Sequence, residues 1–223
     1  MENSISLNAL DSLRLSDEVS RILDLSGGKL NRFHVDISDG RFIPILGQNP
    51  QIVGDLRSEF GDKIHLESHL MVERPSDFID EVADSSDVVF FHVESHEPDW
   101  MRIIDKIDGR CGIGVALFAG TTISAIDVLM NSNIIDAVNL MCEIPGETGE
   151  YHTLVQRKIE QLMDRYYDIP GVRLYADGHS ELDSIYNWID YEEAGFNVCV
   201  HKTVSDEFCK EIKDANTDEE GDI

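Results

Sequence analysis

The segment HVDISDG, residues 34–40, follows a short apolar run and ends in an Asp-Gly turn signal, which predicts a strand that runs into a loop. Residues two apart on a strand point to the same face, so His34 and Asp36 would project together. An imidazole beside a carboxylate can share a metal ion, and the carboxylate can act as a base in proton transfer. The alternative is a buried histidine that is only hydrogen-bonded to the aspartate.

Further apolar runs lie on both sides of this segment, with helical periodicity between them. The predicted strands span residues 5–8, 32–37, 64–71, 88–93, 112–118, 137–141, 172–176 and 198–201. The predicted helices span residues 13–27, 49–59, 100–107, 123–130, 154–166, 181–191 and 206–213, and another begins at Pro75. Eight strand–helix units predict an α/β fold, and eight is the number that closes a (β/α)₈ TIM barrel. A doubly wound open sheet is the alternative, although no Gly-x-Gly-x-x-Gly follows the first strand.

The chain has 223 residues, 42% of them hydrophobic, and no composition break divides it. We expect a single barrel domain over residues 1–215 and a frayed acidic tail over residues 216–223. No apolar run reaches the roughly 18 residues of a membrane span, and the first residues do not resemble a secretory signal. These features favour a cytoplasmic protein whose four cysteines are free thiols.

The formal net charge is −26, from 18 Lys and Arg against 44 Asp and Glu. Such a surface repels nucleic acid and anionic membranes, so neither is expected as a partner. It also opposes an anionic substrate unless a local basic site offsets it. We interpret the charge as an adaptation for solubility rather than as a determinant of partner choice.

Titratable residues gather at the ends of the predicted strands, where barrel enzymes place their active sites. They are His34, Asp36, Asp39, His65, Glu67, His69, His92, Glu94, Asp177, His179, His201 and Lys202. Burying such groups unpaired costs roughly several kcal/mol each, and a metal ion would satisfy many of them together. Two imidazoles with two carboxylates suit zinc, iron(II), manganese or cobalt.

Five motifs resemble, in chain order, those of the ribulose-phosphate 3-epimerase family. They are His34-Val-Asp-Ile-Ser-Asp-Gly-Arg-Phe-Ile-Pro44, Glu67-Ser-His-Leu-Met71, His92-Val-Glu94, Met141-Cys-Glu-Ile-Pro-Gly146 and Asp177-Gly-His179. The first two correspond to the family's His-Val-Asp-x-Met-Asp-Gly-x-Phe-Val-Pro and Asp-x-His-Leu-Met. The resemblance covers nearly the whole chain. It implies a ribulose-phosphate binding barrel that acts as a carbohydrate epimerase, an isomerase that inverts the carbon next to a ketose carbonyl.

Carried over residue by residue, the resemblance implies one divalent metal ion per chain, with the ligands His34, Asp36, His69 and Asp177. Asp36 and Asp177 would also transfer the protons, which suits the chemistry because inversion needs an acid/base group on each side of the carbon. The ion would stabilise the enediolate formed between the two proton transfers. The family's substrate-contacting positions fall on Ser6, His69, Met71 and Met141. The family analogy also implies a homo-oligomer.

The glycine-rich places that hold a phosphate in the family are altered here. The loop after the sixth strand keeps Gly146 and Gly149 but adds two glutamates, at positions 147 and 150. After the seventh strand Gly178 remains, whereas His179 replaces the second glycine. Glycine matters there because backbone N–H groups must approach the anion closely.

The third such place, a Gly-Ser in the family, reads His201-Lys202. These side chains and His179 could replace the backbone donors as cations, so we count all the altered positions as substrate-binding. The motifs that hold the metal ligands and acid/base groups of the family are kept, whereas the glycine-rich motifs that hold its phosphate differ. We therefore expect a small-molecule ketose with a modified, nucleotide-linked or unphosphorylated tail.

Two other functions stay open at this point. Related barrel decarboxylases use Asp-x-Lys-x-x-Asp on the second strand, but this chain has Asp36-Ile-Ser-Asp39, and lyases of the Schiff-base type need a lysine inside the barrel. A non-catalytic barrel that binds a ligand is the second alternative. We further expect His65 at the base of the barrel, and His92 with Glu94 as a structural hydrogen-bonded pair.

Overall fold

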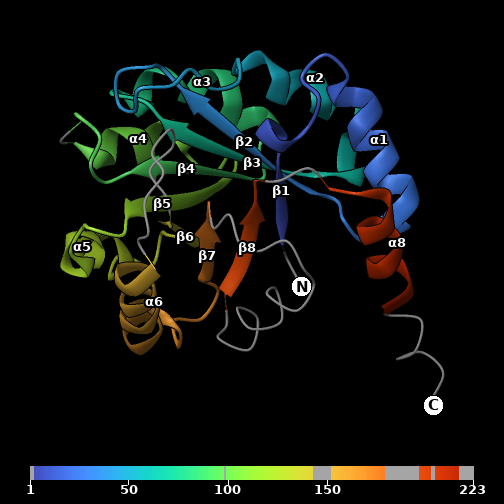
Figure 1. Ribbon diagram of the computed structural model, residues 1–223. Helices are drawn as coiled ribbons and strands as arrows, with labels where there is room; N and C mark the ends of the chain where they lie inside the picture. Colours follow the sequence, from blue (N-terminus) through green and yellow to red (C-terminus); the bar gives the residue numbers. More distant parts are fainter. Residues whose placement is uncertain (1–2, 98, 143–151, 179–195, 202–203, 216–223) are drawn as a thin grey trace.

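The computed structural model describes residues 3–97, 99–142, 152–178, 196–201 and 204–215. Eight parallel strands close into a barrel in chain order, with the last strand paired to the first, and helices surround it (Figure 1). The strands are β1 Ser4–Ser6, β2 Arg32–Ser38, β3 His65–Met71, β4 Val88–His92, β5 Gly112–Phe118, β6 Ala137–Met141, β7 Arg173–Asp177 and β8 Phe196–Val200. The helices are α1 Leu15–Ser26, α2 Gln51–Phe60, α3 Ile79–Val82, α4 Trp100–Ile107, α5 Asp127–Met130, α6 His152–Tyr166 and α8 Asp206–Ala215. The predicted single-domain TIM barrel is confirmed, and the open sheet is excluded.

Several element boundaries differ from the sequence prediction for local reasons. The first strand ends at Ser6 rather than at residue 8, because the Ser6 hydroxyl accepts a hydrogen bond from the Asn8 N–H (3.2 Å) and starts a 3₁₀ turn. The helix expected over residues 123–130 consists of a 3₁₀ turn, Ile123–Ile126, followed by α5. The helix expected over residues 181–191 and the tail over residues 216–223 lie outside the described residues.

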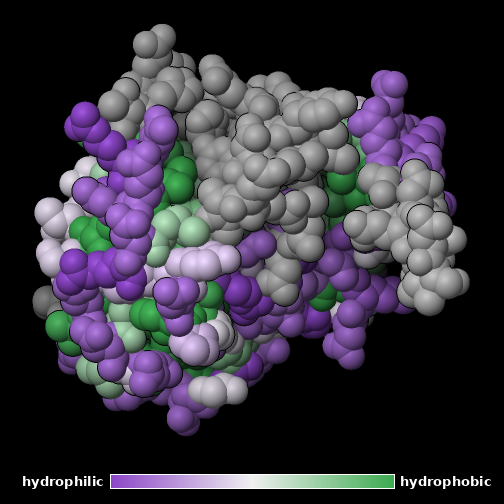
Figure 2. Space-filling model, turned by 90° about the horizontal axis from the view of Figure 1, so that it is seen from below, coloured by the Kyte–Doolittle hydropathy of each residue, from purple (hydrophilic) through white to green (hydrophobic). Residues whose placement is uncertain are grey.

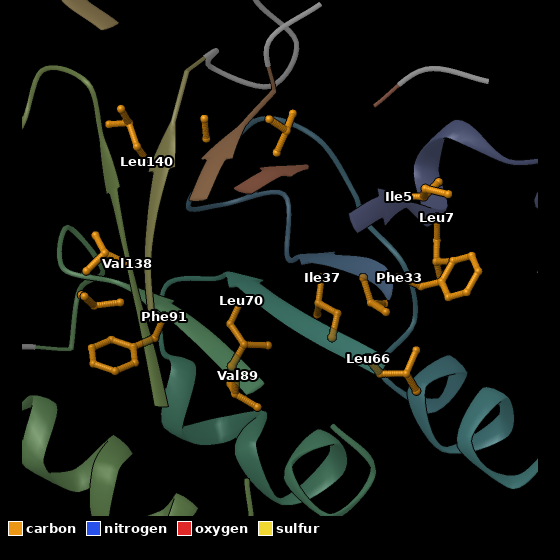
Figure 3. Close-up of a cluster of buried hydrophobic side chains, with 14 of the residues drawn as sticks. Ile5, Leu7, Phe33, Ile37, Leu66, Leu70, Val89, Phe91, Val138 and Leu140 are labelled. Carbon is orange, nitrogen blue, oxygen red and sulfur yellow. The ribbon is translucent and has the colours of Figure 1, made fainter. Parts of the chain in front are cut away.

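Two apolar layers result from the alternation of side chains along the strands. The outward-facing residues pack against the helices, and Figure 3 shows Leu66, Leu70 and Val89 on the helix-facing side of β3 and β4. The lower interior of the barrel is filled by a smaller cluster, Val88, Phe90, Ala116, Ala137 and Tyr175. A Cβ on Gly114 would lie 2.3 Å from the Phe90 ring, so this packing requires glycine. The interior above this cluster is polar.

The loop after β2 is fastened over the mouth of the barrel by Asp39. Its Oδ1 accepts hydrogen bonds from the N–H groups of Arg41 (2.9 Å) and Phe42 (3.0 Å), and its Oδ2 accepts one from the Glu73 N–H (2.8 Å). The loop then returns so closely to β2 that a Cβ on Gly47 would lie 2.4 Å from the Asp36 carbonyl oxygen. The DG turn of HVDISDG therefore ties two of the loops at the mouth together.

Hydrophilic residues cover most of the described surface on the face drawn in Figure 2. In the described part of the chain, the exposed large hydrophobic residues are Leu13, Leu46, Met101, Val128, Leu154 and Tyr167. Among the described residues, no helix is long and apolar enough to cross a membrane.

Candidate metal centre and active site

Four side chains from three strands meet inside the barrel near the C-terminal ends of the strands. In the register of β2 with β3, His34 lies opposite Glu67 and Asp36 lies opposite His69, so one imidazole and one carboxylate of each strand face inward together. Asp177 ends β7 and joins them. His34, Asp36, His69 and Asp177 are each at most 1% exposed. Water therefore cannot satisfy these polar groups, and they must satisfy one another or share a ligand.

The separations of the inner atoms fit a single divalent ion. His34 Nε2 lies 3.1 Å from His69 Nδ1, 3.4 Å from Asp36 Oδ1 and 3.4 Å from Asp177 Oδ2. His69 Nδ1 lies 3.3 Å from each of the same two oxygens. Ligands about 2.0–2.1 Å from a tetrahedral zinc ion are about 3.3 Å apart. The four residues form a buried group consistent with a divalent metal site.

The electrostatics of the cluster also favour a cation. Burial raises the pKa of a carboxyl group, but the imidazoles of His201 and His34 outweigh it and hold the pKa values of Asp36 and Asp177 well below the usual range. Burial lowers the pKa of His34, but the carboxylates of Asp177 and Asp36 outweigh it and raise that pKa well above its usual value. Without an ion, the cluster thus takes up a proton where a metal would supply the charge.

Glu67 fixes the ring of His34 through a hydrogen bond on the side away from the cluster. Its Oε2 accepts a hydrogen bond from His34 Nδ1 (3.2 Å), which directs Nε2 into the cluster, where a bound ion would replace the Nε2 proton. Its Oε1 accepts two hydrogen bonds from Arg32 (3.0 and 3.2 Å). Arg32 also lies 2.7 Å from Nε2 of His65, which begins β3 at the base of the barrel as expected from its position. This arrangement pairs a fully buried carboxylate with a cation.

Glu94 fixes the ring of His69 through His92. Both oxygens of Glu94 accept hydrogen bonds, Oε1 from the Phe118 N–H and the Thr121 hydroxyl and Oε2 from His92 Nδ1 (3.0 Å). His92 Nε2 therefore carries a lone pair, which accepts a hydrogen bond from His69 Nε2 (2.9 Å). His69 Nδ1 is left unprotonated and faces the cluster. The expected His92–Glu94 pair is thus present, and it sets the tautomer of a candidate ligand.

Each aspartate has a second oxygen outside the cluster. Asp36 Oδ2 accepts hydrogen bonds from the Ser6 hydroxyl (2.8 Å) and from Asn8 Nδ2 (3.1 Å). Asp177 Oδ1 lies 2.6 Å from His201 Nε2. Asn139 instead donates to the inner oxygen, Asp177 Oδ2 (2.8 Å).

Sequence analysis did not identify Asn8 or Asn139 as site residues. Asn139 left one signal, because it is a polar residue at an inward position of an otherwise apolar strand, β6. Asn8 left none. It lies beyond β1 and reaches Asp36 only because the chain turns at Ser6.

A cavity of about 130 Å³ opens beside Asp36 and His201. The described residues that line it are Asn8, Asp36, Ile45, Met71, Met141, Gly178 and His201. Met71 and Met141 also belong to a small apolar cluster with Ile43, against which Phe42, Ile45 and Phe118 pack. One side of the cavity is therefore apolar and the other carries the carboxylate and the imidazole.

The structure brings most of the predicted site residues to this place. Ser6, His34, Asp36, His69, Met71, Met141, Asp177, Gly178 and His201 all lie in the cluster, in its hydrogen bonds or in the cavity wall. Gly146, Gly149, His179 and Lys202 lie outside the described residues. The fold and the cluster define a TIM-barrel enzyme with a candidate divalent-metal centre at the C-terminal mouth of the barrel.

The sequence comparison identifies the family. The model of the ribulose-phosphate 3-epimerase family matches residues 3–204, and the chain belongs to this family as a ribulose-phosphate 3-epimerase-like isomerase. The cytoplasmic isoform of ribulose-phosphate 3-epimerase from Oryza sativa subsp. japonica is 30% identical over 178 residues, covering 78% of this chain and 74% of the relative. The ribulose-phosphate 3-epimerase of Schizosaccharomyces pombe is 30% identical over 201 residues, covering 89% and 83%.

Solved structures that resemble the chain share its fold at low identity. The 3-hexulose-6-phosphate synthase of Salmonella typhimurium superposes with a TM-score of 0.64 at 13% identity, covering 98% of this chain and 99% of the other. The 3-keto-L-gulonate-6-phosphate decarboxylase of Vibrio cholerae O1 biovar El Tor gives a TM-score of 0.64 at 11% identity, covering 97% of each chain. At such identities the likeness concerns the barrel alone.

Proposed function

We propose that the chain is a metal-dependent ketose 3-epimerase that inverts the carbon next to the carbonyl group. One divalent ion would be held by His34, His69, Asp36 and Asp177. Their mixture of nitrogen and oxygen donors suits zinc, iron(II), manganese or cobalt. Asp36 and Asp177 would be the two acid/base groups. The substrate is a ketose, and family membership implies a sugar phosphate.

The observation that carries this proposal is that each of the two aspartates has one oxygen in the metal-ligand cluster and one oxygen outside it. Asp36 Oδ1 and Asp177 Oδ2 face the two imidazoles, whereas Asp36 Oδ2 and Asp177 Oδ1 lie outside the cluster. The two residues come from β2 and β7, which β1 and β8 separate in the barrel. A substrate carbon between them would have a proton carrier on each side, which is the requirement for inversion.

The remaining residues support the two aspartates. A bound divalent ion would stabilise the negative charge that develops on the substrate oxygens after proton removal. Ser6 and Asn8 orient Asp36, Asn139 and His201 orient Asp177, and Met71 with Met141 would exclude water from the reacting carbon.

We extend the proposal to the substrate tail, which would differ from a simple phosphate. The support is His201, an imidazole in the cavity wall at a position where the family has a small residue. Gly146, Gly149, Gly178, His179 and Lys202 would complete the tail site. A cytoplasmic location and a homo-oligomeric state also remain predictions, and the relative from Oryza sativa is named as a cytoplasmic isoform.

The direct test follows exchange of the substrate proton with solvent deuterium by NMR. Metal-loaded protein is incubated with ketose phosphates, nucleotide-linked ketoses and free ketoses, and an established ribulose-phosphate 3-epimerase serves as the positive control. We expect deuterium at the carbon next to the carbonyl together with formation of the epimer. If no ketose exchanges while the control enzyme exchanges its substrate, the proposed reaction is wrong.

A further inference from the structure

A second group of ligand-type side chains lies beside the first, and the proposed reaction does not use all of them. Cys199 Sγ is 3.6 Å from His201 Nε2, which in turn is 2.6 Å from Asp177 Oδ1. One donor atom from each of the three residues lies within 4.8 Å of the others. Cys199 is paired with Asp177 in the register of β7 with β8, and it is 1% exposed. A buried thiol, an imidazole and a carboxylate are together typical zinc ligands.

We propose that Asp177, Cys199 and His201 form a second metal-binding subsite, which shares Asp177 with the first. It would take a thiolate-preferring ion such as zinc, whereas the first cluster has only nitrogen and oxygen donors. Asp177 would bridge the two ions, since its Oδ2 faces the first cluster and its Oδ1 faces His201.

The distances allow such an ion with a small movement. A tetrahedral zinc ion with a sulfur ligand at about 2.3 Å and a nitrogen ligand at about 2.0–2.1 Å holds these two atoms about 3.5–3.6 Å apart. The observed separation of Cys199 Sγ and His201 Nε2 is 3.6 Å. The contact of His201 with Asp177 is a hydrogen bond of 2.6 Å, so the ion would replace its proton and the two atoms would separate by about 0.7 Å to reach a ligand spacing. His201 lies beyond the end of β8, and its side chain is 30% exposed, which leaves room for this shift.

The second ion has a consequence for turnover, which rests on the proposed function. Asp177 Oδ1 is the oxygen that would carry a proton to or from the substrate. An ion bound there removes this oxygen from proton transfer, because a carboxylate bridging two ions has no free basic oxygen. The subsite is therefore inhibitory: the first equivalent of zinc supports activity and the second suppresses it. Binding at this subsite releases two protons to solvent, that of the Cys199 thiol and that which His201 Nε2 shares with Asp177 Oδ1, since both ligand atoms must be deprotonated to hold the ion.

Cobalt(II) provides a probe that separates the two sites. Metal-free, reduced full-length protein is titrated with cobalt(II) and then with zinc, and bound metal per chain is measured together with the near-ultraviolet spectrum. A sulfur-to-cobalt charge-transfer band reports only an ion that is bound by a thiolate, and the first cluster contains none. We expect two ions per chain, with the band growing during the second equivalent.

The variant that tests the assignment is Cys199→Ser, and Cys142→Ser is the matched control because Cys142 is also a buried cysteine outside any disulfide. Cys199→Ser should bind one ion, lack the band and lose at least about 100-fold in affinity for the second ion, because removal of a ligand costs no less than removal of its supporting partner. Cys142→Ser should bind two ions and keep the band. A single ion per chain in the wild type, with or without the band, overturns the subsite. A band that persists in Cys199→Ser overturns it as well.

Activity separates this inference from the proposed function. Adding the second zinc equivalent should lower epimerisation in the wild type and in Cys142→Ser but not in Cys199→Ser. If two ions bind with the expected spectrum and the second does not lower turnover, the inhibitory role is wrong. If the metal counts are as expected and no ketose is epimerised under any loading, the proposed function fails and the subsite stands.

Discussion

Replacement of Glu94 by glutamine should switch the tautomer of His69, although Glu94 does not contact the candidate metal position. Glu94 acts only as an acceptor, for the Phe118 N–H, the Thr121 hydroxyl and His92 Nδ1. A glutamine that keeps its oxygen on Phe118 and Thr121 must turn its NH₂ group toward His92 Nδ1. His92 would then accept at Nδ1 and carry its proton on Nε2. His69 would have to accept at Nε2 and would carry its own proton on Nδ1, toward the cluster.

The magnitude follows from the number of hydrogen bonds and ligands involved. The hydrogen bond between His92 and an ionised carboxylate, which contributes about 1.5–3 kcal/mol, is replaced by one between His92 and a neutral amide, which contributes about 0.5–1.5 kcal/mol. Removal of a partner that orients a metal-binding histidine typically weakens metal affinity by about 10–100-fold, or about 1.4–2.8 kcal/mol. We therefore expect the zinc dissociation constant of Glu94→Gln to rise by about 10–100-fold. Burial lowers the pKa of His92, so this ring stays neutral and a tautomer change, rather than protonation, is the available response.

The assay is a zinc competition titration against a chromophoric chelator, together with ¹⁵N chemical shifts of the histidine rings in metal-free protein. Glu81→Gln is the matched control, because Glu81 is an exposed glutamate on α3 and the same charge is removed. The ring shifts should show His69 protonated on Nε2 in the wild type and on Nδ1 in Glu94→Gln. Zinc affinity within about twofold of the wild type, with unchanged ring shifts, would refute the chain of tautomers from Glu94 to His69.

Three further predictions follow from the same structure. Asp36→Asn and Asp177→Asn should each lower kcat by at least about 10²–10⁴-fold, and near wild-type epimerisation by either variant would exclude it as an acid/base group. Ribulose 5-phosphate should have a lower kcat/KM than a ketose with another tail, and each tenfold difference corresponds to about 1.4 kcal/mol of lost transition-state stabilisation. A kcat/KM for ribulose 5-phosphate above about 10⁵ M⁻¹s⁻¹ would show that the site accepts the simple phosphate. Burial raises the pKa of Asp39, but hydrogen bonds from the N–H groups of Glu73, Phe42 and Arg41 outweigh it, so the pKa in the folded protein lies below the unfolded value of 3.8. The stabilisation by Asp39 is therefore present above pH 3.8 and is lost as the pH falls through the folded pKa. Asp39→Asn should thus lower the free energy of urea unfolding at pH 7 by about 1–3 kcal/mol and make it fall less steeply below pH 4. If the free energy of unfolding of the variant falls below pH 4 as steeply as that of the wild type, Asp39 does not contribute to acid unfolding.

Much of this barrel and its centre follows from local sequence. The eight strand–helix units are visible in the apolar spacing, because each strand needs a short buried run and each helix needs one apolar face. The period of two along β2 and β3 places His34 with Asp36, and Glu67 with His69, on one face. The Gly27–Gly28 stop of α1 was also visible, since Gly27 adopts φ 64° as a helix C-cap. These features depend on neighbours within a few residues, so the sequence alone determined them.

The closure of the barrel and the hydrogen-bond partners of the site residues were decided only by the tertiary structure. An open sheet and a barrel have the same strand pattern, and the pairing of β8 with β1, whose partner residues are 195 positions apart, distinguishes them. The same closure brings Asp177 of β7 to His34 of β2, while the pairing of β7 with its neighbours brings His201 and Asn139 to the two oxygens of Asp177, and no spacing in the sequence reports these contacts. Side-chain hydrogen bonds depend on ångström-scale distances between strands far apart in the chain, whereas the sequence pattern fixes only the face on which each residue lies. The tautomers of His34 and His69, and so their readiness to bind a metal ion, therefore emerge from the folded barrel.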